Sequence, residues 1–439
     1  MPALLDELLE LLRIPSVSAA QPDRRALQAA ADWLCERLER AGAGPEQVVL
    51  AGGNPLVTGE LRAALPDAPT VLAYGHYDVQ DPGPPEAWDS PPFEPVVRDG
   101  RVYARGASDD KGNFLPLLHV ACAGGLPVHV RFLVEGEEEV GSRAALQWLR
   151  ADERGADCAI VFDAGMLDAR TPALTTATRG LIGAFIEVRT AERDLHSGLY
   201  GGAVLNATHV LTRVLAAVVP EPGGRVRKEL RAGIAQPDPE ERAAWAALPP
   251  HVMEIEALGG RRVAHDVLER TWADVALDVN MLSGGAERTI VPATARAFLS
   301  LRLAPGQSAA AVGPVLEGLL REAAPAGVEL DVRLELADPA LFDPSQPALR
   351  LAARALERAI GRPPALIRSG GTIPILAVLA ERGIPTVVSG FALEDDAIHA
   401  PNESFRLESL RLGELAAREL YAALGNLPAE RRAARGAGA

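Results

Sequence analysis

The sequence has only three cysteines, two lysines, few aromatic residues and no long uncharged apolar run. Cys35, Cys122 and Cys158 are odd in number and widely spaced, which excludes a disulfide framework and a thiolate metal site and predicts free thiols. No stretch approaches the roughly 18 apolar residues of a membrane span, so a membrane-spanning protein is excluded. The apolar N-terminus is interrupted by acids and follows no basic segment, which predicts a surface helix and not a signal peptide. We therefore expect a cytoplasmic protein.

The formal net charge is −15, which argues against nucleic acid or an anionic membrane surface as the main partner. An apolar content of 48% with ordinary use of glycine and proline predicts a folded globular protein. Because 439 residues exceed what one hydrophobic core usually serves, we expect two domains.

Strand-like and helical segments alternate up to residue 178 and again after residue 338. This alternation is typical of an α/β domain whose strands are covered by helices on both faces. The strand-like runs are Thr70–Tyr74, Val128–Val134, Cys158–Phe162 and Ile384–Val388, and the helical segments include Leu4–Leu12, Ala26–Ala41, Phe114–Ala123, Ser142–Arg150, Pro347–Ile360 and Leu407–Leu424.

Residues 179–337 have a different pattern. Leu181–Arg189, Ala295–Leu303 and Val328–Leu336 alternate as half-exposed strands do, and two helical segments lie between them, Val204–Val218 and Ala309–Ala323. Two helices against an antiparallel sheet make a small α+β layer of the ferredoxin-like kind. We therefore predict a discontinuous α/β domain, residues 1–178 and 338–439, with a central mostly parallel sheet, and an inserted α+β domain, residues 179–337.

Histidines and acids follow several of the strand-like runs, and a further acid lies in a glycine-rich loop. The carboxyl ends of strands in an open α/β sheet face one crevice, so these side chains are expected to converge. The residues are His76, Asp78, Glu138, Glu139 and Asp163 after strand-like runs, Asp109 in the glycine-rich loop, and His399 after an acidic loop.

Histidine, aspartate and glutamate are ligands suited to zinc, manganese or cobalt. Two histidines and three carboxylates hold two cations if one carboxylate bridges them, and a further carboxylate can then accept a proton from a shared water. Each motif alone has a purely structural explanation, since acids after a strand can also complement a helix dipole or cap a turn. The metal-site interpretation depends on the whole set occurring together.

Five motifs together resemble the M20 family of metallopeptidases, and within it the branch of carnosine-type and cysteinylglycine-type dipeptidases. The motifs are Gly75–Gln80, Arg105–Gly112, Glu138–Ser142, Asp194–Gly202 and Ser369–Pro374. The resemblance extends from about Arg13 to Leu424, nearly the whole chain. It implies a catalytic α/β domain with an inserted lid domain that also forms the interface of a homodimer.

The resemblance implies two divalent metal ions per subunit, with zinc expected first and manganese or cobalt as alternatives. His76 and Asp163 would hold one ion, Glu139 and His399 the other, and Asp109 would bridge both. The resemblance also implies a cis peptide bond after Asp109.

Further roles follow from the same resemblance. Asp78 would accept a hydrogen bond from His76 and so orient its ring. Glu138 would be the general base, taking a proton from the bridging water and giving it to the departing nitrogen.

The resemblance also implies a set of substrate-binding residues. His196 would reach the active site of the partner subunit and stabilise the oxyanion of the tetrahedral intermediate. Thr289 and Arg302 would bind substrate, and an arginine suits a terminal carboxylate through paired hydrogen bonds. Gly371 and Thr372 would line the pocket.

One position departs from the pattern. Dipeptidases of this branch usually carry a glutamate before the Gly-Gly pair, where it meets a free amino terminus, and this chain has Ser369 there. Glu394, Asp395 or Asp396 could take over that contact. The predicted function is cleavage of dipeptides or short peptides, and the alternative with the same metal chemistry is an amidohydrolase acting on N-acyl amino acids.

Two other classes are disfavoured by the residues themselves. A non-catalytic binding protein on a peptidase fold would not need the base and all five metal ligands, yet these are present. The glycine pairs lack Walker and Rossmann spacing, which disfavours a nucleotide-binding protein.

Overall fold

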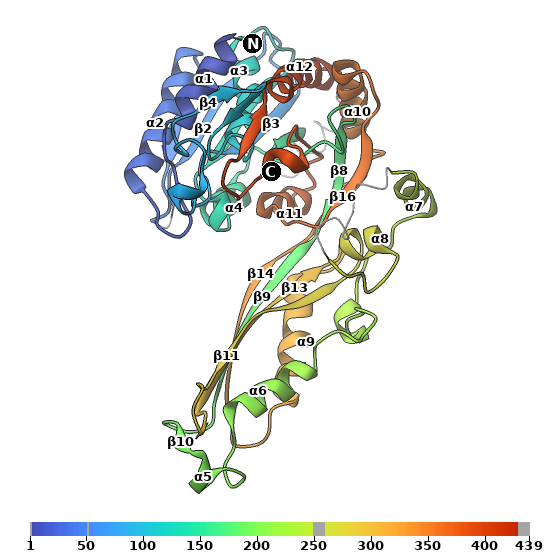
Figure 1. Cartoon of the computed structure of the whole chain (residues 1–439). Helices are drawn as coiled ribbons and strands as arrows, with labels where there is room; N and C mark the ends of the chain where they lie inside the picture. Colours follow the sequence, from blue (N-terminus) through green and yellow to red (C-terminus); the bar gives the residue numbers. More distant parts are fainter. Residues whose placement is uncertain (1, 51, 249–259, 429–439) are drawn as a thin grey trace. The chain divides into compact units, whose positions relative to one another are not determined.

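The computed structural model of the protein describes residues 2–50, 52–248 and 260–428 (Figure 1). The chain forms two compact units: unit 1 comprises Met1–Thr176, Phe342–Ile367 and Ile373–Ala439, and unit 2 comprises Ala177–Leu341 and Arg368–Thr372. These divisions lie within a few residues of those expected at 178/179 and 337/338, except that the short segment 368–372 groups with unit 2.

A nine-stranded mixed sheet forms the core of unit 1, in the order β1-β2-β6-β3-β7-β17-β8-β15, with β16 paired to β8. The central strands β6, β3, β7 and β17 are parallel, and the outer pairs β1-β2, β2-β6, β17-β8 and β8-β15 are antiparallel. The predicted parallel sheet is thus found at the centre. The strands are β1 (Glu46–Val48), β2 (Leu56–Leu61), β3 (Thr70–His76), β6 (His129–Glu135), β7 (Cys158–Phe162), β8 (Ala173–Thr178), β15 (Ala340–Leu341), β16 (Ala365–Ser369) and β17 (Thr386–Ser389).

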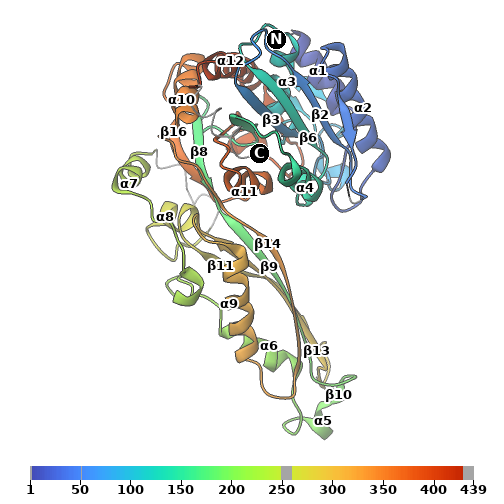
Figure 2. The same cartoon turned by 180° about the vertical axis from the view of Figure 1, so that it is seen from behind.

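Helices cover both faces of this sheet, which explains why β6 and β7 are buried along their whole length. Helices α2, α1, α3, α12 and α10 form one layer, and α4 and α11 lie together on the other face (Figure 2). The bounds are α1 (Pro2–Leu12), α2 (Arg24–Arg40), α3 (Lys111–Cys122), α4 (Arg143–Ala151), α10 (Pro347–Ile360), α11 (Pro374–Glu381) and α12 (Leu407–Leu424).

A small three-stranded sheet, ordered β18-β5-β4, lies beside the main sheet's loops and joins distant parts of the chain. It consists of β4 (Val96–Arg98), β5 (Arg101–Tyr103) and β18 (Ser404–Arg406). The pairing of β18 with β5 brings the segment before residue 404 next to the loop that follows residue 103.

Unit 2 has the element order β9-α6-β11-β13-α9-β14 and the antiparallel sheet order β11-β13-β9-β14, which is the ferredoxin-like arrangement expected for the inserted domain. Both helices lie on one face of the sheet (Figure 1). The core includes Leu211 and Val214 of α6 and Leu316 and Leu320 of α9. The bounds are β9 (Gly180–Arg189), α6 (Ala207–Ala216), β11 (Ala276–Gly284), β13 (Thr294–Leu303), α9 (Ala309–Glu322) and β14 (Glu329–Ala337).

Smaller elements complete unit 2. A two-stranded sheet of β10 (Leu195–His196) and β12 (Ile290–Val291) lies next to the short helix α5 (Ser197–Tyr200). Helices α7 (Pro239–Ala246) and α8 (Val267–Trp272) follow α6. Helix α6 begins later than predicted because the side chain of Asn206 accepts hydrogen bonds from the first free backbone N–H groups of the helix.

In ranges 2–50, 52–248 and 260–428, none of the helices has both the length and the apolar composition needed to cross a bilayer.

Candidate metal centre

The candidate metal ligands come from the carboxyl edge of the parallel strands in unit 1. His76 is the last residue of β3, and Asp163 directly follows β7. Glu138 and Glu139 follow β6 and begin the 3-10 helix η2 (Glu138–Val140). Because β6, β3 and β7 are adjacent and parallel, the side chains that follow them meet at one edge of the sheet.

Asp109 lies between two groups of ligands. His76, Asp109 and Asp163 form one group and Asp109, Glu139 and His399 the other, and in each group the ligand atoms all lie within 4.8 Å of one another. Asp109 Oδ1 is 3.1 Å from His76 Nε2, and Asp109 Oδ2 is 2.9 Å from His399 Nε2. Each oxygen of this carboxylate therefore faces a different group, which is the geometry of a bridging ligand.

Asp78 orients two parts of the centre. His76 Nδ1 lies 3.0 Å from the backbone carbonyl of Asp78 and 3.4 Å from its carboxylate. A carbonyl oxygen only accepts, so Nδ1 carries the proton, and Nε2 faces the ligand group. The Asp78 carboxylate also accepts the backbone N–H groups of Glu138 and Glu139, both at 3.2 Å. The contact to His76 expected from the sequence is thus made chiefly by the backbone of Asp78, while its carboxylate fixes the turn that carries both glutamates.

The loop of Asp109 turns sharply at its glycines. Gly106 has φ +82, and a Cβ atom there would lie 2.6 Å from the side chain of Val79. A Cβ atom on Gly112 would lie 2.0 Å from the carbonyl oxygen of Ala107. Only glycine fits at these two positions. The peptide bond between Asp109 and Asp110 is cis, as the resemblance implied.

Many acids crowd this edge of the sheet, and their charges perturb one another. Burial, with Asp110 and other acids nearby, raises the pKa of Asp163 well above its usual range. Burial and neighbouring acids likewise raise the pKa of Glu138 to about 7. Hydrogen bonds to Asp109 and Glu139 raise the pKa of His399 to about 10. The cluster is therefore short of positive charge.

Two divalent cations fit this donor set. They would supply the missing positive charge, and the histidine nitrogens and carboxylate oxygens are ligands that zinc, manganese and cobalt accept. Glu139 Oε1 is buried and has no hydrogen-bond partner among the described residues, although its other oxygen accepts a hydrogen bond from Gln80 at 2.9 Å. A buried carboxylate oxygen without a partner is costly unless a further ligand completes it, so this atom favours a bound cation.

The residues expected to bind substrate lie in unit 2, at two places. Arg302, near the end of β13, donates to Thr372 Oγ1 at 2.9 Å, next to Gly371. His196 and Thr289 lie together near the other end of β13, where β10 pairs with β12 and the Thr289 carbonyl accepts from Ser197 N. The ten residues of β13 span roughly 30 Å. One chain therefore does not present both pairs to the same small substrate.

The side chain of Ser369, which stands where a glutamate was expected, is engaged within its own loop. Its hydroxyl accepts a hydrogen bond from Gly371 N at 3.1 Å. Glu241 of α7 forms two hydrogen bonds of 2.7 Å with Arg368, so its charge is already paired.

The three acids considered as substitutes lie in unit 1, in the 3-10 helix η5 (Glu394–Asp396). Asp395 and Asp396 both pair with Arg101, and Asp396 is fully buried. Glu394 makes no hydrogen bond or ion pair among the described residues and lines a cavity of about 320 Å³. The other walls of this cavity include the ligand candidates Asp109 and Asp163 and the apolar Met166, Leu393 and Ile398.

Comparison with known proteins identifies the family. The sequence model of the family described as Peptidase family M20/M25/M40 matches residues 72–422 of this chain. This range contains every candidate metal ligand. The chain belongs to this family. The resemblance to M20 metallopeptidases predicted from the motifs is therefore confirmed.

Individual M20 relatives match over most of their length. A cysteinylglycine-S-conjugate dipeptidase from Corynebacterium striatum is 30% identical over 416 residues, covering 91% of this chain and 91% of that protein. A Beta-Ala-His dipeptidase from Homo sapiens is 28% identical over 413 residues, covering 86% of this chain and 80% of that protein. The solved structure of an M20 family metallo-carboxypeptidase, Sso-CP2 from Sulfolobus solfataricus, has a TM-score of 0.87 at 24% identity and covers 97% of this chain and 100% of that one. The predicted fold class is confirmed.

Several residues around the M20 centre were not predicted from the sequence. Gln80 contacts Glu139, and the buried Asp110 accepts a hydrogen bond from His76 N at 3.2 Å. Glu403 is fully buried and contacts the loop of Asp109. Asp110 and Gln80 lie inside the motifs named in the sequence analysis, so a role at the centre could have been inferred for them. No local pattern indicates that Glu403 contacts a loop 294 residues away.

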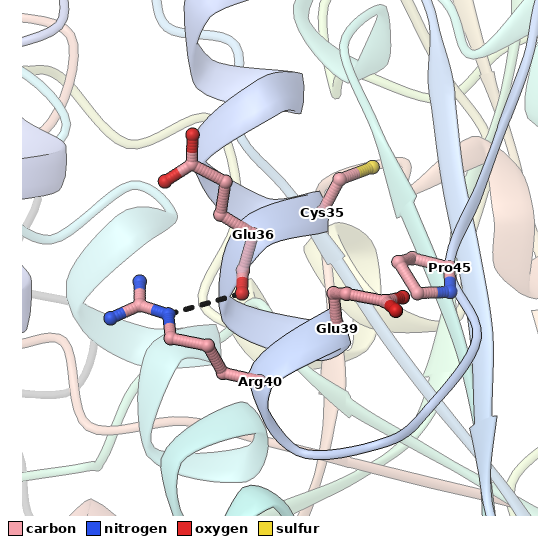
Figure 3. Close-up of a pocket in the computed structure, with 5 residues that line it drawn as sticks. All are labelled: Cys35, Glu36, Glu39, Arg40 and Pro45. Atoms are coloured by element: carbon pink, nitrogen blue, oxygen red, sulfur yellow. Dashed lines mark hydrogen bonds between the residues drawn. The ribbon is translucent and has the colours of Figure 1, made fainter.

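A second hollow lies beside helix α2 and contains none of the metal-ligand candidates (Figure 3). It has a volume of about 490 Å³ and is lined by Cys35, Glu36, Glu39, Arg40 and Pro45. Burial raises the pKa of the Cys35 thiol, which keeps it protonated and unreactive at neutral pH. None of the groups that could hold a metal ion among the described residues lies in this hollow.

Proposed function

We propose that this M20 protein is a metal-dependent hydrolase that cleaves the peptide bond of dipeptides or short peptides. The observation that carries the proposal is the Asp109 carboxylate, with one oxygen facing each of two ligand groups. The two relatives named as dipeptidases, at 30% and 28% identity, support the substrate class.

The metal ligands in this proposal are His76 and Asp163 for one ion, Glu139 and His399 for the other, and Asp109 for both. Zinc is the expected metal, with manganese or cobalt as alternatives. When bound, two such cations polarise a substrate carbonyl and lower the pKa of a water that they share.

Glu138 is the proposed general base. It lies beside the ligand Glu139, and the hydrogen bond from its backbone N–H to Asp78 fixes its position in the turn. Its carboxylate takes a proton from the attacking water and later gives it to the departing nitrogen of the peptide. Asp78 takes part only by orienting His76 and this turn.

Substrate recognition uses both ends of the peptide. We assign Arg302 to the carboxylate terminus, with Thr372 and Gly371 beside it, since a guanidinium binds a carboxylate through paired hydrogen bonds. We assign Glu394 to the amino terminus, because it is the acid of η5 that has no partner and it lines a cavity shared with two metal ligands. With this assignment the protein can still bind a substrate that has a free amine, although Ser369 replaces the glutamate that usually contacts it.

We also propose a homodimer formed through unit 2. Strand β11 is an edge strand, and Val279, Met281 and Leu282 are exposed on it, with Leu199 and Tyr200 exposed on α5. Exposed apolar side chains at a sheet edge favour pairing with another chain. Strand β13 separates the pair His196 and Thr289 from the pair Arg302 and Thr372 by roughly 30 Å. This separation supports a site completed by His196 and Thr289 from the partner subunit.

A cytoplasmic location is the remaining part of the proposal. Cys35, Cys122 and Cys158 are all free thiols, and burial raises the pKa of each. Free thiols of this kind are typical of proteins in a reducing compartment.

The test of the function is hydrolysis of a matched pair, Ala-Leu and N-acetyl-leucine, by metal-stripped protein resupplied with manganese or zinc. We expect cleavage of Ala-Leu and none of the acetylated compound. Cleavage of the acetylated compound alone would replace the proposal with the amidohydrolase alternative. If neither compound is cleaved although metal is bound, the protein would instead be a non-catalytic binding protein on a peptidase fold.

A further inference from the structure

We propose that Glu403 is a positioning residue that holds the loop of Asp109 against the loop of His399 and thereby controls binding of the second metal ion. The inference rests on the proposed metal centre and assigns to it a residue that binds neither metal nor substrate. Glu403 acts through backbone groups and through Arg105.

The Glu403 carboxylate accepts four hydrogen bonds from one short loop. Its Oε2 atom accepts from Arg105 Nη1 at 2.7 Å and from Gly106 N at 3.0 Å. Its Oε1 atom accepts from Ser108 N at 2.9 Å and from Asp109 N at 3.0 Å. Glu403 is fully buried, so no water competes for these donors. Three backbone N–H groups of the loop, those of Gly106, Ser108 and Asp109, thus depend on a single side chain.

This contact joins the two loops on which the second ligand group depends. Glu403 lies four residues after His399, and Asp109 lies at the far end of the loop that Glu403 binds. His399 follows no strand directly, its side chain is 52% exposed, and its backbone has φ +61. His76 and Asp163, in contrast, are fixed at the ends of buried strands. The group of Asp109, Glu139 and His399 is therefore the one that needs an additional tether.

A buried positive charge lies next to Glu403. Arg105 is only 1% exposed, and its guanidinium forms a buried ion pair with Glu403. Lys111 is also fully buried; burial lowers its pKa to about 7, and the negative charge of Glu403 opposes that shift. Asp396 adds a second tie between the same loops, since its carboxylate accepts a hydrogen bond from Ser108 Oγ at 3.0 Å.

The variant Glu403→Gln tests the proposal because it keeps the size of the side chain. An amide has one acceptor oxygen and one NH₂ group, so two of the four loop donors would face another donor. The contact between the loop of Asp109 and the segment of His399 is then loosened, which weakens the group of Asp109, Glu139 and His399 more than the group built on His76 and Asp163. Partners that orient metal ligands typically contribute about 10- to 100-fold to metal affinity, and we expect a loss of that size for one of the two ions.

The experiment is a titration of metal-stripped wild-type and Glu403→Gln protein with Co²⁺, followed by calorimetry and by visible absorption of the bound ion. The wild type should bind two ions per chain. Glu403→Gln should bind one ion with near wild-type affinity and a second about 10- to 100-fold more weakly. Peptide hydrolysis by the variant should recover as the metal concentration rises, because mass action refills the weakened site.

Asp152→Asn is the matched control. It removes one charge of the buried ion pair between Arg131 and Asp152, also in unit 1, at 2.8 Å. We expect this variant to lose stability and to keep both metal affinities. An equal loss of metal affinity in Asp152→Asn would overturn the proposal, because any weakened core would then have the same effect.

Other outcomes are equally decisive. Two ions bound by Glu403→Gln with wild-type affinity would overturn the positioning role. If Glu403→Gln does not fold, Asp396→Asn takes its place, and unchanged binding of both ions in that variant would overturn the proposal. Failure of the wild type to bind two ions would instead refute the proposed metal centre itself.

Discussion

At the scale of single residues, the centre depends on Asp109, because both ligand groups share its carboxylate. Its charge is well supported. Burial opposes ionisation, yet hydrogen bonds from His399 and His76 lower the pKa of Asp109 below its usual value. The Asp109 carboxylate is therefore already in the ionised form that binds cations.

If Glu138 is the general base, its removal should lower turnover and leave metal binding unchanged. Glu138→Ala should lower kcat by about 10²- to 10⁴-fold, because general acid–base groups typically contribute that much. It should leave two metal ions per chain, since Glu138 belongs to neither ligand group. Metal analysis and steady-state kinetics on the same sample check this. A variant with more than about a hundredth of the wild-type rate would contradict the role.

The assignment of Glu394 predicts an effect limited to substrates with a free amine. Glu394→Gln should raise KM for Ala-Leu about 10- to 100-fold, the usual value of a charged hydrogen bond. Propionyl-leucine, which is Ala-Leu without the amine, should inhibit wild type and variant equally. Asp395→Asn is the control, because it changes the same charge in the same short helix but pairs with Arg101. Equal losses on both compounds would refute the amine contact.

The residues that the sequence predicted are those with a local signal. His76 and Asp163 end or follow buried apolar runs, so their convergence could be inferred from the rule that parallel strands share an edge. Glu403 could not be inferred, since its partners lie in a loop almost 300 residues earlier. The use of the Asp78 backbone in place of its carboxylate also depends on a turn geometry that residue type does not encode.

At the scale of elements, the strands predicted best were those whose burial leaves a clear pattern. The runs at β7 and β9 were predicted almost to the residue because burial is continuous in one and alternates in the other. Strand β11 was missed. Its apolar residues Leu277, Val279 and Met281 alternate with Asp278 and Asn280, so a strand signal is present in the sequence, although the residues from Asp278 onward are all exposed. In the structure this segment pairs with β13.

Exposure of β11 also predicts where the dimer can be broken. Leu282 is 58% exposed on this edge strand, and Leu282→Glu would place a buried charge in the proposed interface. We expect a monomer by analytical ultracentrifugation, with both metal ions retained and activity lost, because His196 and Thr289 of the partner are then absent.

A matched substitution distinguishes this from a general effect of added charge. Leu65 is 69% exposed in unit 1, and Leu65→Glu should leave both mass and activity unchanged. A fully active Leu282→Glu monomer would contradict the shared site.

At the scale of the whole molecule, the insertion of unit 2 was predicted because the sequence pattern changes and then returns. The return at α10 and β17 supplies a strand that lies next to β7 in the same sheet, although more than 200 residues separate them. The small segment 368–372 could not be placed from the sequence, because it belongs to unit 2 through contacts such as that of Arg179 with Gly370 and not through any local pattern.

The stability of the metal-free protein should fall between pH 5 and pH 7. Burial raises the pKa of Glu135 to about 8 and that of Glu138 to about 7, so the folded state keeps protons that the unfolded state releases above its ordinary carboxyl pKa. The raised pKa of Asp396, about 6, acts in the same direction. Carboxyls with lowered pKa titrate below this window, and Lys111, with a pKa lowered to about 7, opposes the trend only above it.

Bound metal should oppose this dependence. Cations bind the deprotonated ligands, so their stabilisation grows as protons leave, and the difference in Tm between metal-loaded and metal-free protein should widen from pH 5 to pH 7. In EDTA we expect Tm to fall on the order of 5 °C over that interval. Thermal unfolding by circular dichroism at pH 5, 6 and 7, with and without manganese, measures both effects. A metal-free Tm that rises with pH would mean that the pKa values of the acids at this edge of the sheet are not raised. The electrostatic argument for two cations would then be refuted.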